Sequence, residues 1–182
     1  MRRTVRLLTA LIVFTCGAAS MAAEISLEYA VKANFLYKFG AYITWPDNAT
    51  GAPEDAMKLC IVGADPFGAA LDEAAKGEKI GTHPIAIVRL ATLAPDSGCH
   101  ILFIQGAKRD EIAAALKAVA GKPILTITET PGETIDGNTD IINFVLKDNR
   151  VRFVIDEHAA AASAIEISSK LLNLAVAVRP RS

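Results

Sequence analysis

Apolar and polar positions along this chain form blocks that predict strands alternating with helices. Largely apolar runs predict strands over residues 58–62, 85–90, 100–104 and 124–128. Apolar residues at helical spacing predict helices over residues 26–43, 65–76 and 110–120. Apolar strands that alternate with helices are typical of a mostly parallel sheet flanked by helices. The pattern therefore predicts an α/β fold.

The first predicted helix begins at Ser26, whose hydroxyl suits an N-cap. It ends before Trp45-Pro46, because the residue before a proline avoids helical backbone. Its expected stripe consists of Val31, Phe35, Phe39 and Tyr42. This aromatic segment has two interpretations, a core helix closed by a tryptophan or a partner surface. The core helix is the simpler interpretation and is preferred.

Residues 63–68 join a predicted strand to a predicted helix. Asp65 is expected to cap that helix and Pro66 to occupy its first position. Glycine-rich turns between a strand and a helix can hold phosphate. The sequence has neither the spacing G-x-G-x-x-G nor a following Lys-Ser or Lys-Thr here, so we interpret the segment as a structural turn.

The closing part of the chain combines a predicted hairpin with a predicted amphipathic helix. Apolar runs over residues 141–145 and 151–155 flank a turn-prone segment, which predicts a C-terminal β-hairpin. The closing amphipathic helix is expected over residues 163–178. Its buried face would carry Ile167, Leu171, Leu174 and Val178. Its opposite face would carry Glu166, Ser169, Lys170 and Asn173, with Ser168 at the margin.

The first residues have the order of a secretory signal peptide. Arg2, Arg3 and Arg6 precede an apolar run that is too short to span a bilayer, and small residues follow it. We expect residues 1–23 to be removed and residues 24–182 to form one domain in the periplasm. A lipoprotein anchored at Cys16 is the less favoured alternative.

The net charge of the chain disfavours some classes of binding partner. Without the three leader arginines, 16 basic and 20 acidic residues remain, a net charge of −4. A mildly acidic chain without a basic run is a poor candidate for binding nucleic acid or an anionic membrane. No later stretch is apolar for long enough to span a membrane.

Cys60 and Cys99 are the two cysteines that follow the leader. An even number of cysteines in an oxidising compartment favours a disulfide, and two buried free thiols are the alternative. No cysteine or histidine lies near either one at the spacing of metal ligands, so no metal site is expected.

No catalytic motif is found. The three histidines fall in different predicted elements, and the patterns G-x-S-x-G and H-E-x-x-H are absent from the sequence. Asp156-Glu157-His158 resembles an acid–base cluster, but its place between a strand and a helix favours capping and helix-dipole roles. We therefore expect a protein that is not an enzyme and needs no cofactor.

Four stretches, in the right order, resemble the YfiR-like family of periplasmic regulators. They are Tyr29-Ala30-Val31-Lys32-Ala33 with Phe35-Leu36-Tyr37 and Trp45-Pro46, Gly63-Ala64-Asp65-Pro66-Phe67-Gly68, Cys99-His100-Ile101-Leu102-Phe103-Ile104, and Val151-Arg152-Phe153-Val154-Ile155 with Ala159-Ala160 and Ile167-Ser168-Ser169-Lys170-Leu171-Leu172-Asn173-Leu174-Ala175. Each stretch is weakly specific, but the four together cover nearly all of the chain after the leader.

The resemblance implies a soluble periplasmic protein with a parallel sheet, flanking helices and a hairpin. It implies a repressor of the periplasmic sensor portion of an inner-membrane diguanylate cyclase, which links the chain to cyclic-di-GMP signalling and biofilm formation. An outer-membrane lipoprotein can sequester such regulators. The family's disulfide maps onto Cys60 and Cys99, whereas residues 130–140 contain no counterpart of the second pair of some relatives. The resemblance leaves homodimer formation open.

The family's closing signature runs through Glu166, Ser168, Ser169, Lys170 and Asn173, which we predict to form the partner interface. The alternative for these residues is a solvated helix face. For the whole chain, the alternative function is a periplasmic sensor of small molecules, since ligands settle at the C-terminal edge of parallel sheets. A hydrolase with an unfamiliar site is the least favoured class.

Overall fold

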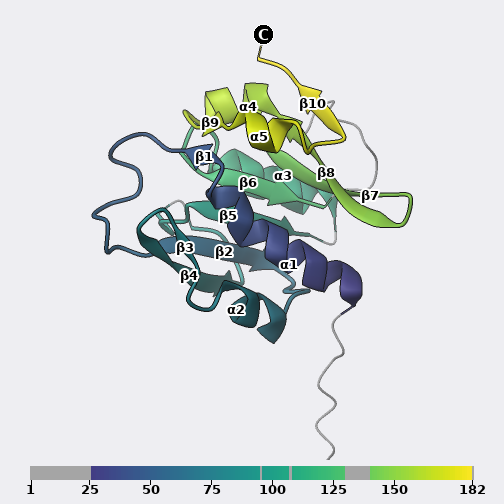
Figure 1. Ribbon diagram of the computed structural model, residues 1–182, viewed down its shortest axis with the longest axis horizontal. Helices are drawn as coiled ribbons and strands as arrows, with labels where there is room; N and C mark the ends of the chain where they lie inside the picture. The colour runs from purple at the N-terminus through teal and green to yellow at the C-terminus, as the bar shows by residue number, and fades with distance from the viewer. Residues whose placement is uncertain (1–25, 95, 107, 130–139, 182) are drawn as a thin grey trace, which may run out of the picture.

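The computed structural model describes residues 26–94, 96–106, 108–129 and 140–181 (Figure 1). The elements follow in the order α1 (Leu27–Gly40), β1 (Ile43–Thr44), β2 (Met57–Gly63), α2 (Ala69–Ala75), β3 (Lys79–Ile80), β4 (His83–Leu90), β5 (Ile101–Gln105), α3 (Arg109–Ala118), β6 (Leu125–Thr128), β7 (Ile142–Lys147), β8 (Arg150–Asp156), α4 (Glu157–Ala162), β9 (Glu166–Ile167), α5 (Ser169–Leu172) and β10 (Ala177–Arg179). The predicted signal peptide, residues 1–23, and most of the loop at 130–140 lie outside the described residues.

Eight strands form one sheet in the order β10-β8-β7-β6-β5-β2-β4-β3. Strands β4, β2, β5, β6 and β7 run parallel to one another, and β10 is parallel to β8. The pairs β3–β4 and β7–β8 are antiparallel. The predicted α/β fold with a mostly parallel sheet and a C-terminal hairpin is confirmed.

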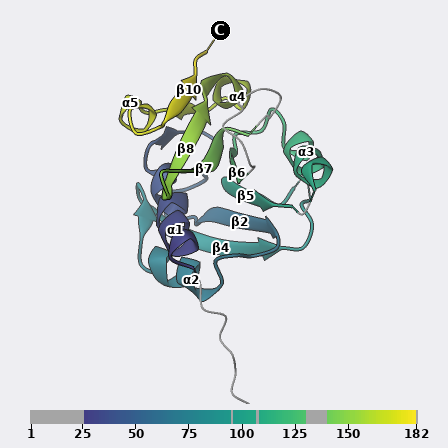
Figure 2. The ribbon, with the colours of Figure 1, turned by 90° about the vertical axis from the view of Figure 1, so that its right-hand side faces the viewer.

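Helices cover both faces of the sheet. Figure 2 shows α1 and α2 on one side and α3 on the other. Side chains alternate between the faces of a strand, so Leu59 and Ile61 of β2 pack toward α1 and α2, whereas Cys60 and Val62 pack toward α3. Four phenylalanines join α1 to the β7–β8 hairpin, namely Phe35, Phe39, Phe144 and Phe153, with ring centroids 5.0–6.2 Å apart.

Local signals account for several elements. The Tyr29 N–H donates to the Ser26 hydroxyl, which confirms the predicted N-cap of α1. The hairpin turn places Asp148 and Asn149 at φ 51° and 55°. Two residues with positive φ between antiparallel strands are the geometry of a tight hairpin turn, and Asn and Asp tolerate it.

The predicted end of the first helix was wrong. Helix α1 stops at Gly40, three residues before residue 43, and Ile43–Thr44 form strand β1. Ile43 pairs with Ile167 and Thr44 with Glu166. These two residues thus pair with a strand that is remote in the sequence and do not continue the helix. Trp45, which follows them, is half-buried against the core.

The predicted start of the second helix was also wrong. Helix α2 begins at Ala69 with Gly68 as its N-cap. The Asp65 carboxylate accepts hydrogen bonds from the Phe67 N–H at 2.8 Å and the Gly68 N–H at 3.2 Å. Asp65 therefore closes the turn before the helix and does not cap the helix itself.

The closing helix predicted over residues 163–178 is divided among several elements. Helix α4 ends at Ala162, Ala164 has φ 54°, β9 pairs with β1, α5 spans only Ser169–Leu172, and β10 joins the sheet edge beside β8. Leu171 is buried as predicted, but Leu174 is 59 % exposed. The segment forms strands and not one continuous helix, because pairing of β9 with β1 and of β10 with β8 also satisfies the backbone hydrogen-bonding groups of β1 and β8.

Candidate functional site

The five residues predicted for the partner interface lie on consecutive elements of the closing segment. Glu166 is in β9, Ser168 is the N-cap of α5, Ser169 and Lys170 are in α5, and Asn173 is its C-cap. The Lys170 N–H donates to the Ser168 hydroxyl at 3.3 Å, so Ser168 has a capping role. The other four residues are exposed. We call these five residues the β9–α5 surface, and its part in binding stays a prediction.

A second surface, which we call the α1–hairpin groove, joins α1 to the tip of the β7–β8 hairpin. Leu27 is 82 % exposed and Leu146 is 56 % exposed. Two hollows of about 430 and 410 Å³ lie along α1, and Leu27, Val31 and Phe35 line both of them. The helical stripe predicted that Val31 and Phe35 lie in the core, but both are only partly buried. The spacing of four between Leu27, Val31 and Phe35 was the available signal.

A buried cation lies on the inner side of α1. Lys32 is 1 % exposed, and its ammonium donates to Glu28 and to Glu129, the latter at 2.5 Å. The same ammonium lies 4.7 Å from the centre of the Tyr29 ring. Burial, and then the charge of Glu129, raise the pKa of the Tyr29 hydroxyl. Because a buried charge is costly unless it is paired, this cluster fixes the rotation of α1 on the sheet.

A cleft of about 390 Å³ opens at the C-terminal ends of β2 and β5. Its floor and walls include Val62, Gly63, Ile104, Gln105, Ala114, Ala115 and Ala118. The chain leaves β2 toward β4 on one side and later continues from β5 toward β6 on the other, so β2 and β5 flank a topological switch point. Open α/β sheets bind ligands at such points. Gly63 has φ +88°, and a Cβ there would lie 1.8 Å from the Gln105 carbonyl oxygen.

Cys60 and Cys99 form a disulfide with a Cα–Cα distance of 5.8 Å, as predicted. Cys60 is in the middle of β2, and Cys99 lies just before β5. Both cysteines are buried on the α3 side of the sheet. The bridge thus ties the loop after β4 to the strand that forms one side of the cleft.

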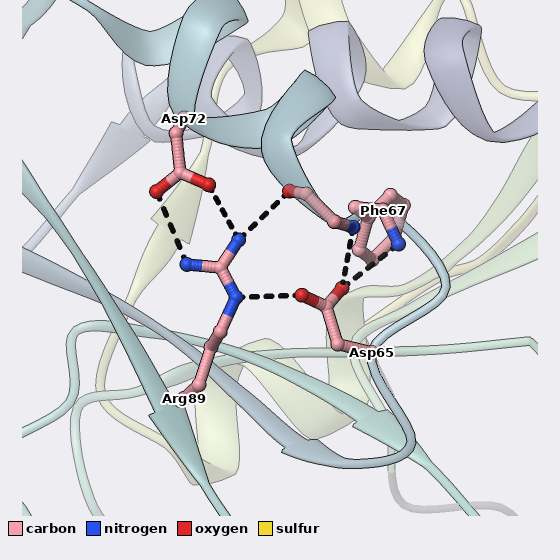
Figure 3. A network of polar contacts seen from close by, with 5 residues as sticks. Asp65, Phe67, Asp72 and Arg89 are labelled. Carbon is pink, nitrogen blue, oxygen red and sulfur yellow. Dashed lines mark hydrogen bonds and ion pairs between the residues drawn. The ribbon is translucent and has the colours of Figure 1, made fainter. Parts of the chain in front are cut away.

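Figure 3 shows an ionic network that braces the turn after β2. The Arg89 guanidinium donates to the Asp72 carboxylate at 2.6 and 3.1 Å, to Asp65 at 2.6 Å and to the Gly68 carbonyl at 2.8 Å. The hydrogen bonds that Arg89 donates to Asp72 and Asp65 hold the pKa of its guanidinium above its usual range, and Arg89 lowers the pKa of Asp72. Four hydrogen bonds from one guanidinium to the turn and to α2 support a structural role.

Polar side chains also gather beside the end of β6. Thr128 donates to the buried Asp140 carboxylate at 2.6 Å, and burial raises the pKa of Asp140. The nearby Asp156 caps α4 by accepting from the Ala159 N–H at 2.9 Å. This contact confirms the capping role predicted for Asp156.

The residues that the structure describes contain no group of three or more His, Cys, Asp or Glu side chains that could hold a metal ion. Within the same ranges, no helix is long and apolar enough to cross a membrane.

Comparison with known families decides the class of protein. The YfiR/HmsC-like family matches residues 29–176, which is most of the chain. This chain belongs to the YfiR/HmsC-like family. Members of this family are periplasmic regulators of cyclic-di-GMP signalling. A search among curated proteins found no match.

The YfiR/HmsC-like match includes the disulfide, the cleft and the whole β9–α5 surface. It also includes Val31, Phe35 and Leu146 of the α1–hairpin groove, whereas Leu27 lies two residues before it. Membership therefore directs the functional question to surfaces that a regulator could present to a partner.

Proposed function

We propose that this protein binds the periplasmic sensor portion of an inner-membrane diguanylate cyclase and represses its activity. The family match over residues 29–176 is the observation that carries the proposal. The leader, residues 1–23, directs export to the periplasm and is cleaved. Intact-mass analysis of exported material would detect this cleavage. A diacylated Cys16 in that mass would contradict it.

The test measures binding and signalling together. The periplasmic domain of each membrane-bound diguanylate cyclase of the source cell is produced separately and titrated with the protein. We expect one of these domains to bind, and we expect cellular cyclic-di-GMP to rise when the gene is deleted and to fall again on complementation. Binding to none of the domains, with unchanged cyclic-di-GMP, would overturn the proposal.

The β9–α5 surface is the predicted place of contact. Glu166→Arg with Lys170→Glu should weaken binding, because charge reversal at a docking surface adds like-charge repulsion. A matched control is Glu73→Arg with Lys76→Glu, which reverses an exposed glutamate and an exposed lysine at the end of α2. Both variants should keep the melting temperature of the wild type. Equal affinity of both variants and the wild type would remove this surface from the interface.

An outer-membrane lipoprotein that sequesters the regulator is part of the same proposal. Sequestration requires the lipoprotein and the cyclase to compete for the protein. We therefore expect the purified soluble part of such a lipoprotein to displace the cyclase domain from the complex. A stable complex of all three proteins would contradict this competition.

A periplasmic sensor of small molecules is a second candidate function, and the cleft at the switch point favours it. A metabolite that binds there should raise the melting temperature, since ligands stabilise the state they bind. Ala114→Phe, at an exposed position in the lining, should fill the cleft and abolish that rise. A rise that persists in this variant would place the ligand elsewhere.

A further inference from the structure

The α1–hairpin groove exposes apolar side chains that the fold leaves without cover. Three large hydrophobic residues are well exposed in the described part of the chain, and two of them, Leu27 and Leu146, line the same hollow. Val151 of β8 lines that hollow too. Exposed apolar residues scattered singly are ordinary, but a contiguous apolar patch with polar residues at its edge marks an interaction surface.

The groove is held in a fixed shape. The Phe35 ring packs against Phe39, Phe144 and Phe153 with centroids 5.6–6.2 Å apart, so its exposed edge cannot withdraw from the surface. The buried Lys32 cluster fixes the first turns of α1 in the same way. A surface that is already ordered loses little conformational entropy when a partner docks.

Charge around the groove is one-sided. Arg150 and Arg152 line the hollow beside the hairpin, and Lys38 lines the hollow on the other flank of α1. None of the three forms an ion pair with the carboxylates that the structure describes. The one acid in the two linings, Glu28, is bonded to Lys32. The chain as a whole carries a net charge of −1, so this basic edge is a local feature.

We propose that the α1–hairpin groove docks an apolar segment with acidic flanks that belongs to the periplasmic domain of the cyclase. This inference rests on the proposed function and adds a second contact with the same domain to the one predicted at the β9–α5 surface. A second copy of the chain is the poorer occupant. A twofold interface sets the same surface on both sides, so the surface edged by Arg150, Arg152 and Lys38 would meet an equally basic surface.

The experiment titrates the purified cyclase domain with the full mature protein and two groups of variants. Leu27→Ser with Leu146→Ser should weaken binding at least tenfold while the melting temperature stays near that of the wild type. Leu27→Met with Leu146→Met is the matched control, because it changes the same two exposed positions but keeps them apolar. Lys38→Glu with Arg150→Glu should weaken binding and flatten its salt dependence. Lys117→Glu, on α3 across the sheet, is the charge control.

Each result supports or overturns the inference. Loss of affinity in the groove variants, with both controls at wild-type affinity, supports it. Unchanged affinity in the serine variant and in the charge variant of the groove overturns it and leaves the proposed function intact, and so does an equal loss in the methionine variant. A dimer that dissociates in the groove variants without loss of cyclase binding would assign the groove to a second copy. If the wild-type protein binds no cyclase domain, the proposed function fails, and the inference fails with it.

Discussion

At the scale of single residues, Lys32 shows how a charge can organise a core. The sequence placed it within an aromatic helix, and the structure buries it against Tyr29 and between two glutamates, Glu28 and Glu129. Glu28 is one turn away on α1, but Glu129 follows β6 and is remote in the sequence. The ion cluster therefore fastens α1 to the end of the central sheet.

Removing Glu129 should show what this cluster contributes. Glu129→Ala should lower the free energy of unfolding by about 2–3 kcal/mol, below the usual cost of breaking a fully buried pair because Glu28 remains bonded to Lys32. Denaturant unfolding measures this loss. Glu73→Ala removes one partner of the exposed pair with Lys76 and should change stability by less than about 0.5 kcal/mol. Similar losses in the two variants would contradict a special role for Lys32.

His100 should make stability depend on pH. Its Nδ1 accepts a hydrogen bond from the Lys58 N–H at 2.9 Å, and burial lowers its pKa below the usual 6.5. The unfolded chain then binds a proton that the folded protein does not, so stability falls as the pH drops below about 6.5. Melting temperatures of the wild type and His100→Gln should converge between pH 7.5 and pH 5.5. Parallel curves would contradict this account, since the raised pKa of Asp140 affects both proteins equally.

At the scale of elements, the closing segment contains apolar residues at the same helical spacing that differ in burial. Leu171 and Leu174 are three positions apart, and the helical pattern predicted that both are buried. In the structure α5 ends at Leu172, Leu171 is in the core and Leu174 is exposed. The segment is held by β9 against β1 and by β10 against β8.

Two substitutions distinguish this arrangement from a continuous helix. Leu171→Ala should cost about 2–5 kcal/mol of unfolding free energy, because it leaves a cavity in the core. Leu174→Ala should cost less than about 0.5 kcal/mol. Chemical denaturation of the two variants provides the comparison, and equal large losses would mean that one helix buries both residues.

At the scale of the whole molecule, the disulfide links strand β2 to the segment just before strand β5. Cys60 and Cys99 are 39 residues apart, and the connection between them contains α2, β3 and β4. Closing a loop of that length restricts the unfolded chain strongly. The bridge therefore stabilises the half of the sheet on which the switch-point cleft is built.

The double variant Cys60→Ala, Cys99→Ala should lose about 4 kcal/mol of unfolding free energy on the loop-entropy account. Reduction of the wild-type protein should produce a comparable loss, and this serves as the control for the substitutions themselves. Titration of the denatured, unreduced wild type should find no free thiol after leader removal. Two titratable thiols would show that the bridge does not form.

The sequence by itself determined most of the sheet and one of its turns. The apolar run at 58–62 became β2 and the run at 100–104 became β5, because a strand buried on both faces needs apolar residues at every position. The hairpin at Asp148-Asn149 followed from residues that tolerate positive φ. The disulfide followed from an even number of cysteines in a chain with a leader.

Only the tertiary structure decided the closing segment, the burial of Lys32 and the α1–hairpin groove. Ile43 and Ile167, which pair as strands, are too remote in the sequence for a local pattern to relate them. Val31 and Phe35 have one face in the core and one in solvent, and periodicity cannot distinguish such residues from fully buried ones. The physical reason is the same in each case. The spacing of apolar residues along the chain limits which residues can be buried together. Long-range strand pairing and packing determine which of these residues are buried.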